Sequence, residues 1–264
     1  MQSFRDSLGT SSKIPDVKKV TIGECPECRN GKMPNGQPER KRQLQKLVYA
    51  DGTEKIIPCI CHKEREVQEK QRLINASKID SYSVIDEEYK NASWDHLELK
   101  SEQQQKAYVT VTNYIENLEE NIKKGRGLLF QGSYGTGKTY ISAIVRRAVL
   151  KTGHSVLFIS FPEYFQRMAD KQKTFKQDDK IIDIASDADL LILDEVNADL
   201  NTWQQTELYR LVDRRKGKST IYTTNYKSDD FRKDVKLAQS FSRMMANKDI
   251  VLLNGTDYRI KGAL

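Results

Sequence analysis

Cysteine is scarce in this sequence and is confined to one end of it. The four cysteines all precede residue 62, and no later position carries a thiol. No apolar run approaches the roughly 20 residues that cross a bilayer, and the N-terminal "MQSFRDSLGTSSKIPDVKK" lacks the apolar centre of a secretory signal. We therefore expect a cytoplasmic protein with no membrane contact. In such a reducing compartment, paired cysteines bind metal more often than they form disulfides.

The charge balance is basic but mixed. The 264 residues hold 44 Lys and Arg against 37 Asp and Glu, a formal charge of +7. Such a surplus favours polyanionic partners, although most of these side chains belong on a mixed, solvated surface. The length allows one full-sized domain and a smaller second one, and there is no internal repeat. Composition makes nucleic acid a candidate partner without establishing it.

Three stretches of different texture predict the domain organisation. Residues 1–75 form an N-terminal module, with a flexible or partly ordered arm to about residue 22 and the turn-rich "RNGKMPNGQPE" between the cysteine pairs. Residues 76–100 form a linker, and residues 101–264 form the main domain. Three anchors in the linker can pack on the main domain: Tyr89, Trp94 and Leu97.

The main domain opens with a predicted helix and continues as alternating strands and helices. The helix covers roughly 101–123, with Ser101 as its N-cap and Gly125 as its stop. Five apolar runs then indicate buried strands: "GLLFQG", "SVLFIS", "LLILDE", "STIYTTN" and "IVLLN". Helices are expected near 138–151, 162–170, 202–216 and 234–246. This alternation predicts an α/β fold, a parallel sheet wrapped by helices.

The most specific motif is "GSYGTGKT", between the first of these strands and the helix that follows it. It matches the phosphate-binding loop pattern, in which glycines let successive N–H groups converge on phosphate oxygens at a helix N-terminus. Lys138 is expected at the β- and γ-phosphates and Thr139 at magnesium. The predicted nucleotide-binding residues are Gly132, Ser133, Tyr134, Gly135, Thr136, Gly137, Lys138, Thr139 and Tyr140.

Polar residues end two later strands. The run "LLILDE" delivers Asp194 and Glu195 to the carboxyl edge of the sheet, where Asp194 can hold magnesium and Glu195 can polarise the attacking water. The run "STIYTTN" brings Asn225 to the same edge, where its amide can orient that water or touch the γ-phosphate; the alternative is a helix cap or turn residue. Because Asp194, Glu195 and Asn225 all end strands that follow a phosphate loop, the catalytic interpretation is favoured for each of them.

The cysteine pairs predict one tetrahedral zinc site. Their spacings are C-x2-C and C-x-C, and a site of four thiolates is structural, since it leaves no open coordination position. The spacing leaves two ligand sets open, because a histidine follows the last cysteine. One set is Cys25, Cys28, Cys59 and Cys61; the other replaces one cysteine by His62.

The order of phosphate loop, acidic strand and polar-ended strand resembles that of the AAA+ ATPases. The resemblance implies ATP and Mg²⁺ as ligands, ATP hydrolysis, and self-association through the ATPase domain. It also implies that Arg243, in "AQSFSRMMANK", reaches the γ-phosphate of a neighbouring subunit. Without the neighbour, Arg243 is an ordinary surface residue on an amphipathic helix.

The sequence also resembles one particular branch of these ATPases. This resemblance covers residues 88–264 and is carried by "NASWDHL", "GSYGTGKTYISAI", "LLILDE" and "STIYTTN". After the fifth strand the sequence offers no space for a helical lid, as in helicase loaders of the DnaC/DnaI type and their IstB-type relatives in transposition. The zinc module is similar to that of DnaI-type loaders, where it binds the helicase. The resemblance therefore implies a loader that delivers a hexameric replicative helicase onto single-stranded DNA.

Two other functions remain open at this point. An IstB-type transposition ATPase would act on duplex DNA, and a nucleotide-switched DNA-binding module would show little turnover. Single-stranded DNA requires basic and aromatic side chains, for which two segments are candidates. These offer Lys171, Lys173, Phe175 and Lys176, and Arg214, Arg215, Lys216 and Lys218; an ordinary solvated surface is the alternative for both.

Overall fold

The computed structural model describes residues 17–24, 43–57, 60–97, 99, 101–171 and 181–255. The chain separates into two compact units, residues 1–71 and 72–264. The division falls inside helix α1, Ile60–Asp80. Of the predicted linker 76–100, every described residue belongs to the second unit.

The first unit contains an antiparallel sheet of three strands in the order β1-β2-β3. These are β1 Val17–Glu24, β2 Gln43–Tyr49 and β3 Glu54–Ile57. A tight turn joins β2 to β3, with Gly52 at a φ of 82° that favours glycine. Strand β1 includes residues 17–22, the last part of the stretch for which the sequence predicts a flexible or partly ordered arm. These residues are ordered because β2 supplies hydrogen-bonding partners that the local sequence does not reveal.

The second unit is built on a five-stranded parallel sheet in the order β5-β6-β7-β4-β8. All five strands that the apolar runs predicted are present, so the predicted α/β fold is confirmed. Their bounds are β4 Gly127–Gln131, β5 Val156–Ser160, β6 Leu190–Asp194, β7 Ser219–Thr224 and β8 Lys248–Leu252. The chain order and the spatial order differ, which brings β6, β7 and β4 side by side at the centre.

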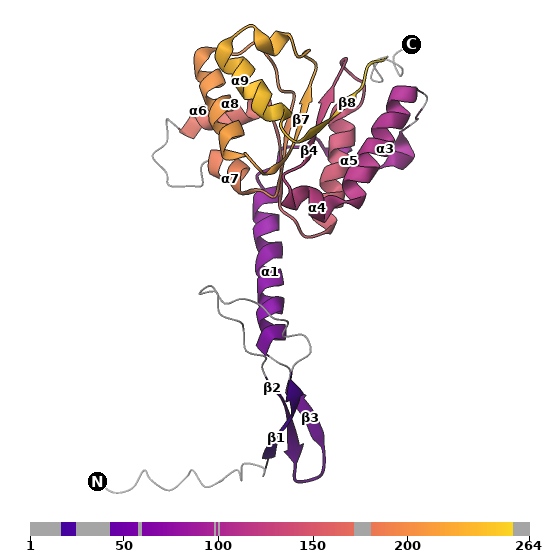
Figure 1. The fold of residues 1–264 in the computed structure, drawn as a ribbon, viewed down its shortest axis with the longest axis vertical. Coiled ribbons are helices and arrows are strands. Elements are labelled where there is room, and N and C mark those ends of the chain that lie inside the picture. Colours follow the sequence, from indigo (N-terminus) through magenta and orange to yellow (C-terminus); the bar gives the residue numbers. More distant parts are fainter. Residues whose placement is uncertain are drawn as a thin grey trace, which may run out of the picture. The chain divides into compact units, whose positions relative to one another are not determined.

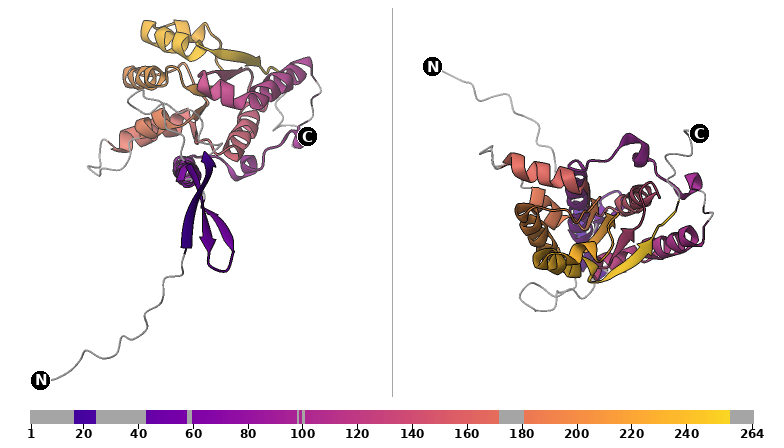
Figure 2. Two further views of the ribbon diagram at one scale, coloured as in Figure 1. Left: turned by 60° about the horizontal axis from the view of Figure 1, so that its bottom comes forward. Right: turned by 90° about the horizontal axis from the view of Figure 1, so that it is seen from above.

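Helices cover both faces of this sheet (Figure 1). The helices are α2 Glu87–Lys90, α3 Glu102–Glu116, α4 Leu118–Lys123, α5 Lys138–Lys151, α6 Phe161–Lys171, α7 Ile181–Asp187, α8 Thr202–Arg214 and α9 Val235–Met245, with 3-10 turns η1 Trp94–His96 and η2 Asp230–Arg232. Helices α6 to α9 contribute to the core on one face, and α3, α4 and α5 to the core on the other. Figure 2 shows the same two layers from further directions.

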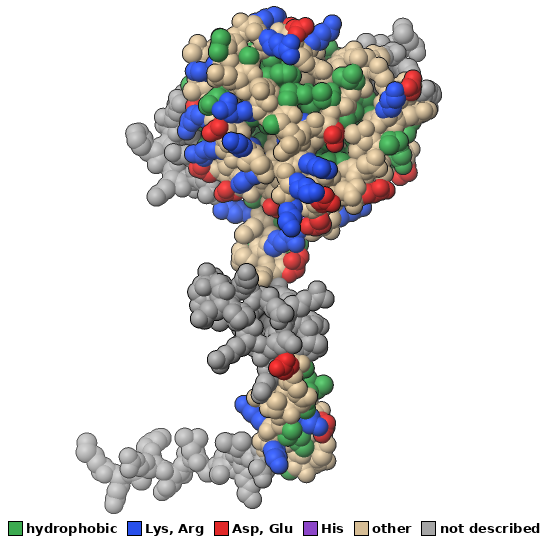
Figure 3. All heavy atoms as spheres, in the orientation of Figure 1, with side chains coloured by type: hydrophobic (Ala, Val, Ile, Leu, Met, Phe, Trp, Pro, Cys, Tyr) green, Lys and Arg blue, Asp and Glu red, His purple; other side chains and the backbone are tan. Residues whose placement is uncertain are grey.

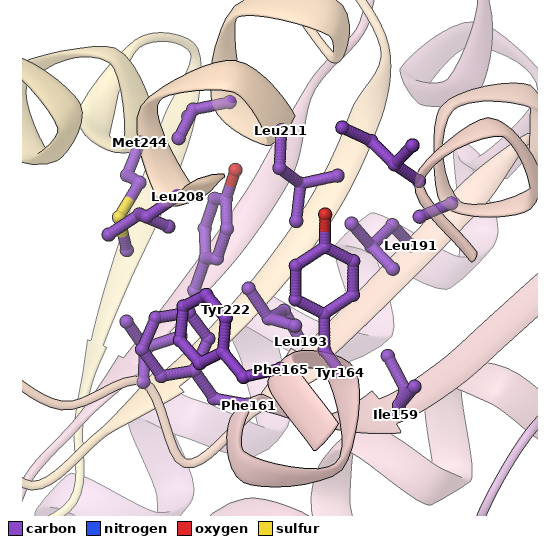
Figure 4. Packing of buried hydrophobic residues seen from close by; sticks show 14 of the residues in the cluster. Ile159, Phe161, Tyr164, Phe165, Leu191, Leu193, Leu208, Leu211, Tyr222 and Met244 are labelled. Carbon is purple, nitrogen blue, oxygen red and sulfur yellow. The ribbon is translucent and has the colours of Figure 1, made fainter. Parts of the chain in front are cut away.

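Alternate residues of each central strand enter the two cores. In β6, Leu191 and Leu193 pack in the cluster under α6 to α9, whereas Leu190 and Ile192 pack in the cluster under α3 and α5. Figure 4 shows the first cluster, in which the β6 leucines lie with aromatic rings of α6 and leucines of α8. Because both faces of β4, β5 and β6 are buried, these three strands are nearly continuous apolar runs instead of alternating ones.

The helix predicted over 101–123 is interrupted. Ser101 does cap α3, in a reciprocal capping box with Gln104, and Gly125 follows α4 at a φ of 66°. Between them Asn117 leaves the helical region, and its side-chain amide donates to the carbonyl of Asn113 at 2.9 Å. An Asn side chain that competes for backbone groups in this way weakens a helix interior, which explains the break.

The stretch before α3 packs on the helical layer of its own unit. Trp94 lies edge-on against Tyr108 of α3, with ring centroids 4.8 Å apart, and Ala92 is buried. Tyr89 meets the ring of Tyr140 on α5 in the same manner at 6.2 Å. The aromatic anchors of the sequence thus bind this stretch to the layer of α3 and α5.

Candidate nucleotide-binding site

The loop between β4 and α5 needs glycine at three positions. Gly132, Gly135 and Gly137 have φ values of 152°, 67° and 88°. A Cβ on Gly132 would also lie 1.9 Å from the carbonyl oxygen of Leu253, in the chain beside β4. Only glycine combines this backbone with that close approach, so the loop conformation follows from the spacing of the motif.

Helix α5 begins from this loop without a side-chain cap. Its N-cap is Gly137, so no side chain caps it, and its first turn contains no acidic residue. The first N–H groups of a helix have no intrahelical partner and carry partial positive charge. The start of α5 is therefore suited to a phosphate group.

Lys138 lies over the same loop. Its side chain is buried, and Nζ donates to the carbonyl oxygens of Gly132 at 3.0 Å and Ser133 at 2.5 Å. The Thr136 hydroxyl donates to Ser133 as well, at 2.9 Å. These bonds place the ammonium group at the mouth of the loop, where it can meet phosphate oxygens.

Thr139 and Asp194 come together across the sheet edge. Thr139 Oγ1 lies 3.0 Å from Oδ2 and 3.2 Å from Oδ1 of the carboxylate, which ends β6. Burial raises the pKa of Asp194, against the lowering effects of hydrogen bonds from Thr223 and Thr139 and of the Lys138 charge. A hydroxyl and a carboxylate in contact are the oxygen donors that a small divalent cation prefers.

Glu195 and Asn225 complete this edge. Glu195 is exposed and has a φ of 59°, the left-handed region that is unusual for a residue with a side chain. Asn225 follows β7, and its Oδ1 is buried without a hydrogen-bond partner in the described part of the chain. An unpaired buried oxygen is costly and is expected where a ligand or water completes the site.

The phosphate loop and the sheet edge line one pocket of about 450 Å³, with Asp194 buried behind Thr139 and Thr223. Its lining includes most of the predicted loop residues, together with Glu195, Thr223 and Asn225. A further wall comes from Glu88, Tyr89, His96 and Leu97, which the sequence analysis did not assign to the site. The Tyr140 hydroxyl holds that wall, since it accepts from Ser93 N at 3.1 Å. In the sequence, the anchors Tyr89, Trp94 and Leu97 were the feature from which this wall of the pocket could have been predicted.

Comparison with known protein families shows to which family the chain belongs. The family model described as IstB-like ATP binding protein matches residues 41–264. The chain belongs to this family of ATP-binding proteins. The IstB-like assignment agrees with the phosphate loop and with the resemblance seen in the sequence.

Among curated proteins, this IstB-like chain is similar to the replicative helicase loader DnaC of Escherichia coli strain K12. The two are 24% identical over 227 residues, which cover 84% of this chain and 89% of DnaC. A crystal structure of the DnaC helicase loader aligns with a TM-score of 0.58 and 25% identity, over 64% of this chain and 99% of that one. DnaI aligns with a TM-score of 0.56 and 21% identity, over 68% and 98%, a likeness of fold.

Arg243 is not among the residues that line the pocket. Its guanidinium stands 4.4 Å from the ring centroid of Tyr209 on α8, donates to the hydroxyl of that tyrosine at 2.8 Å, and lies 3.4 Å from Asp213. The side chain is partly exposed. The IstB-like fold thus presents Arg243 beside α8 and not at the phosphate loop.

One proposed DNA contact is contradicted by the structure. Arg215 is buried, and its guanidinium donates to main-chain carbonyls at the start of the sheet, among them Ala185 at 3.2 Å and also Ala188 and Ser219. Lys218 donates to Ser186 O at 2.5 Å. Because Arg215 supports the fold from inside, it cannot contact a DNA backbone.

The other candidate DNA contacts are not tested. Arg214 forms an ion pair with Asp183, and the segment with Lys173, Phe175 and Lys176 lies outside the described residues.

On the face seen in Figure 3, the surface of the second unit has no large patch of only positive or only negative charge. Lys and Arg side chains there are interspersed with Asp and Glu, and hydrophobic side chains lie between them. This mixed pattern is the solvated surface expected from composition. The described residues of the chain contain no helix that is both long and apolar enough to span a membrane.

The predicted zinc ligands are beyond what the structure describes. Cys25, Cys28 and Cys59 lie outside the described residues, and Cys61 and His62 fall in the first turn of α1, where only the backbone is described. Within the described ranges no three His, Cys, Asp or Glu side chains gather as a metal-binding group. The zinc site stays a prediction.

Proposed function

We propose that this chain is a cytoplasmic, ATP-dependent helicase loader, which binds the hexameric replicative helicase and delivers it onto single-stranded DNA. The observation that carries the proposal is the contact of Thr139 with Asp194 beside the phosphate loop, in a chain similar to DnaC over 84% of its length. A nucleotide site supports an energy-coupled role, and the relative's function supports helicase loading as that role.

The residues of the pocket fit ATP and Mg²⁺. The uncapped start of α5 and the ammonium of Lys138 suit the phosphates, and the unpaired Oδ1 of Asn225 suits a polar ligand or water. Thr139 and Asp194 would hold the cation. When bound, the cation supplies positive charge against the phosphate oxygens.

We assign hydrolysis to the residues at the sheet edge. Glu195, exposed in the pocket, accepts a proton from the attacking water and so raises its nucleophilicity. Asn225 orients that water or the γ-phosphate through its amide. Arg243 acts on the pocket of a neighbouring subunit, which its absence from the lining of its own pocket and its partial exposure support.

The N-terminal module, residues 1–75, is the proposed helicase-binding part. One structural zinc ion would be held there by Cys25, Cys28, Cys59 and Cys61, or by three of these with His62. No residue of the β1-β2-β3 sheet whose side chain is described is fully buried, so the sheet contributes little apolar core of its own. A metal would supply part of the missing stability.

The experiment that tests the loader is size-exclusion chromatography of the full chain with the replicative helicase of its own host, with and without a non-hydrolysable ATP analogue. A defined complex supports the proposal. No complex under any nucleotide condition overturns it, and DNA-stimulated activity beside a transposase would then favour the IstB-type function.

The nucleotide site is tested by Lys138→Ala, with Lys151→Ala as a matched control. Lys151 is exposed at the far end of the same helix. Binding of a fluorescent ATP analogue and phosphate release should be lost in the first variant and kept in the second. Full turnover in Lys138→Ala would refute the phosphate-loop assignment, and nucleotide binding without turnover in the unaltered chain would favour the nucleotide-switched module.

A further inference from the structure

We propose that Thr223 is a positioning residue for the nucleotide site, because its hydroxyl joins Asp194 to the main chain of Glu195. Thr223 lies on β7, is 1% exposed, and lines the pocket. Its Oγ1 lies 2.5 Å from Asp194 Oδ1 and 2.9 Å from Glu195 N. The inference rests on the proposed function, since it concerns how the two acids are held for Mg²⁺ and water.

The direction of these hydrogen bonds follows from the chemistry of the groups. A main-chain N–H can only donate, so Thr223 Oγ1 accepts from Glu195. The single hydroxyl proton of Thr223 is then available for Asp194 Oδ1. Two hydroxyls therefore donate to one carboxylate, from Thr223 on β7 and from Thr139 on α5. Their combined effect is to fix the plane of the Asp194 carboxylate.

Thr223 also stabilises an unfavourable backbone. Glu195 has a φ of 59°, which is unfavourable for a residue with a Cβ. Its N–H is bound by the Thr223 hydroxyl, and the next N–H, that of Val196, donates to the Thr223 carbonyl at 2.8 Å. One residue of β7 thus supplies partners to two successive N–H groups of the turn. This arrangement sets the direction in which the Glu195 side chain leaves the chain.

The strand geometry places Thr223 with Asn225. Thr223 and Asn225, the residue that follows β7, both line the pocket, whereas Thr224, the next residue on the strand after Thr223, points to the other side. The Thr224 hydroxyl donates to the Val196 carbonyl at 2.6 Å and has no bond to Asp194. Thr224 is therefore a neighbour with the same chemistry and a different partner.

The test compares Thr223→Val, which keeps the shape and removes the hydroxyl, with Thr223→Ser, which keeps the hydroxyl. The readouts are the Mg²⁺ concentration that half-saturates binding of a fluorescent ATP analogue, and kcat and KM for ATP. We expect Thr223→Val to raise the half-saturating Mg²⁺ concentration about tenfold and to lower kcat about tenfold or more, with KM within about threefold, from the loss of a hydrogen bond to a charged group. Thr223→Ser should restore both within about threefold.

Thr224→Val is the matched control, and its half-saturating Mg²⁺ concentration should stay within about threefold of the unaltered chain. Wild-type Mg²⁺ dependence in Thr223→Val, or equal damage in the Val and Ser variants, would overturn the inference. If Thr223→Val melts below the assay temperature, Thr223→Cys replaces it and should show the same increase, since a thiol is a weak hydrogen-bond partner. An unaltered chain without Mg²⁺-dependent nucleotide binding would instead refute the proposed function.

Discussion

The hydroxyl of Thr139 lies 3.0 Å from the carboxylate of Asp194, although 55 positions separate the two residues in the chain. The contact joins the first turn of α5 to the end of β6. In the sheet, β7 lies between β4 and β6, so the two residues meet across the end of the strand that carries Thr223. The phosphate loop and the acidic strand thereby form one site, whose parts can be altered separately.

Glu195→Gln should separate nucleotide binding from hydrolysis. The substitution keeps the size and removes the carboxylate that accepts the proton of water, so turnover should fall by about 100-fold or more while ATP affinity stays within about threefold. Steady-state phosphate release and titration with a fluorescent analogue measure the two effects. Glu116→Gln, at an exposed position of α3, is the control. Wild-type turnover in Glu195→Gln would show that another group activates the water.

Arg243→Ala should impair a neighbouring site and leave its own pocket intact. Alone, the variant should bind ATP normally and hydrolyse it at least tenfold more slowly, because a cation that stabilises transition-state charge is absent. Mixed with Lys138→Ala chains, which have a defective pocket and an intact Arg243, it should regain part of its turnover. Mixtures no more active than the separate variants would contradict action between subunits.

Arg215→Met should destabilise the fold strongly. Burial lowers the pKa of Arg215 to about 10, and its guanidinium satisfies several main-chain carbonyls that would be left unpaired. We expect a loss of about 2–4 kcal/mol in the free energy of unfolding, measured by urea denaturation. The neighbouring Arg214→Met removes an exposed ion pair with Asp183 and should cost less than about 1 kcal/mol. Similar values for both variants would contradict a structural role for Arg215.

Lys248→Met should stabilise the protein in a pH-dependent way. Burial, with a smaller effect of the Arg215 charge, lowers the pKa of Lys248 to about 8 from 10.5. Between these values the unfolded chain binds more protons, so this lysine makes the free energy of unfolding rise with pH across that window. At pH 7 the charged, buried form is a penalty, and its removal should add roughly 1–3 kcal/mol.

The measurement is the difference in unfolding free energy between Lys248→Met and the unaltered chain at pH 7 and near pH 10. The difference should be largest at pH 7 and should shrink as the pH rises through 8. A difference that does not depend on pH would show that Met acts by packing beside Gly127, where an added Cβ would lie 2.9 Å from the lysine stem, and not by removing a charge.

Replacing Cys25 and Cys28 with Ser should remove the proposed zinc. Thiolates are the expected ligands, and a hydroxyl does not replace them at a structural site. Zinc content per chain should fall from about one to near zero, and helicase binding should be lost, while binding of the ATP analogue should be unchanged. A double variant that keeps stoichiometric zinc would exclude this ligand set. Substituting Cys61 and His62 one at a time would then distinguish the two alternatives.

Local patterns in the sequence determined much of the second unit. The spacing of Gly132, Gly135 and Gly137 specifies a loop that other residues cannot form, and runs of buried apolar residues specify the strands. The position of Asp194 at the end of such a run then predicts its place at the sheet edge, where it is found. These features depend on residues close together in the chain, so their periodicity and spacing reveal them.

Only the tertiary structure decided which distant groups meet. The order of the strands brings Thr223 between Asp194 and Glu195, adds the wall around Tyr89 and His96 to the pocket, and buries Arg215 among carbonyls. By sequence alone Arg215 belonged to a basic surface segment, because its neighbours are charged. Thr223 is 28 positions from Glu195 in the chain, and Arg215 is 30 positions from the Ala185 carbonyl that it binds. Their meeting depends on how strands and helices pack, which a local pattern does not encode.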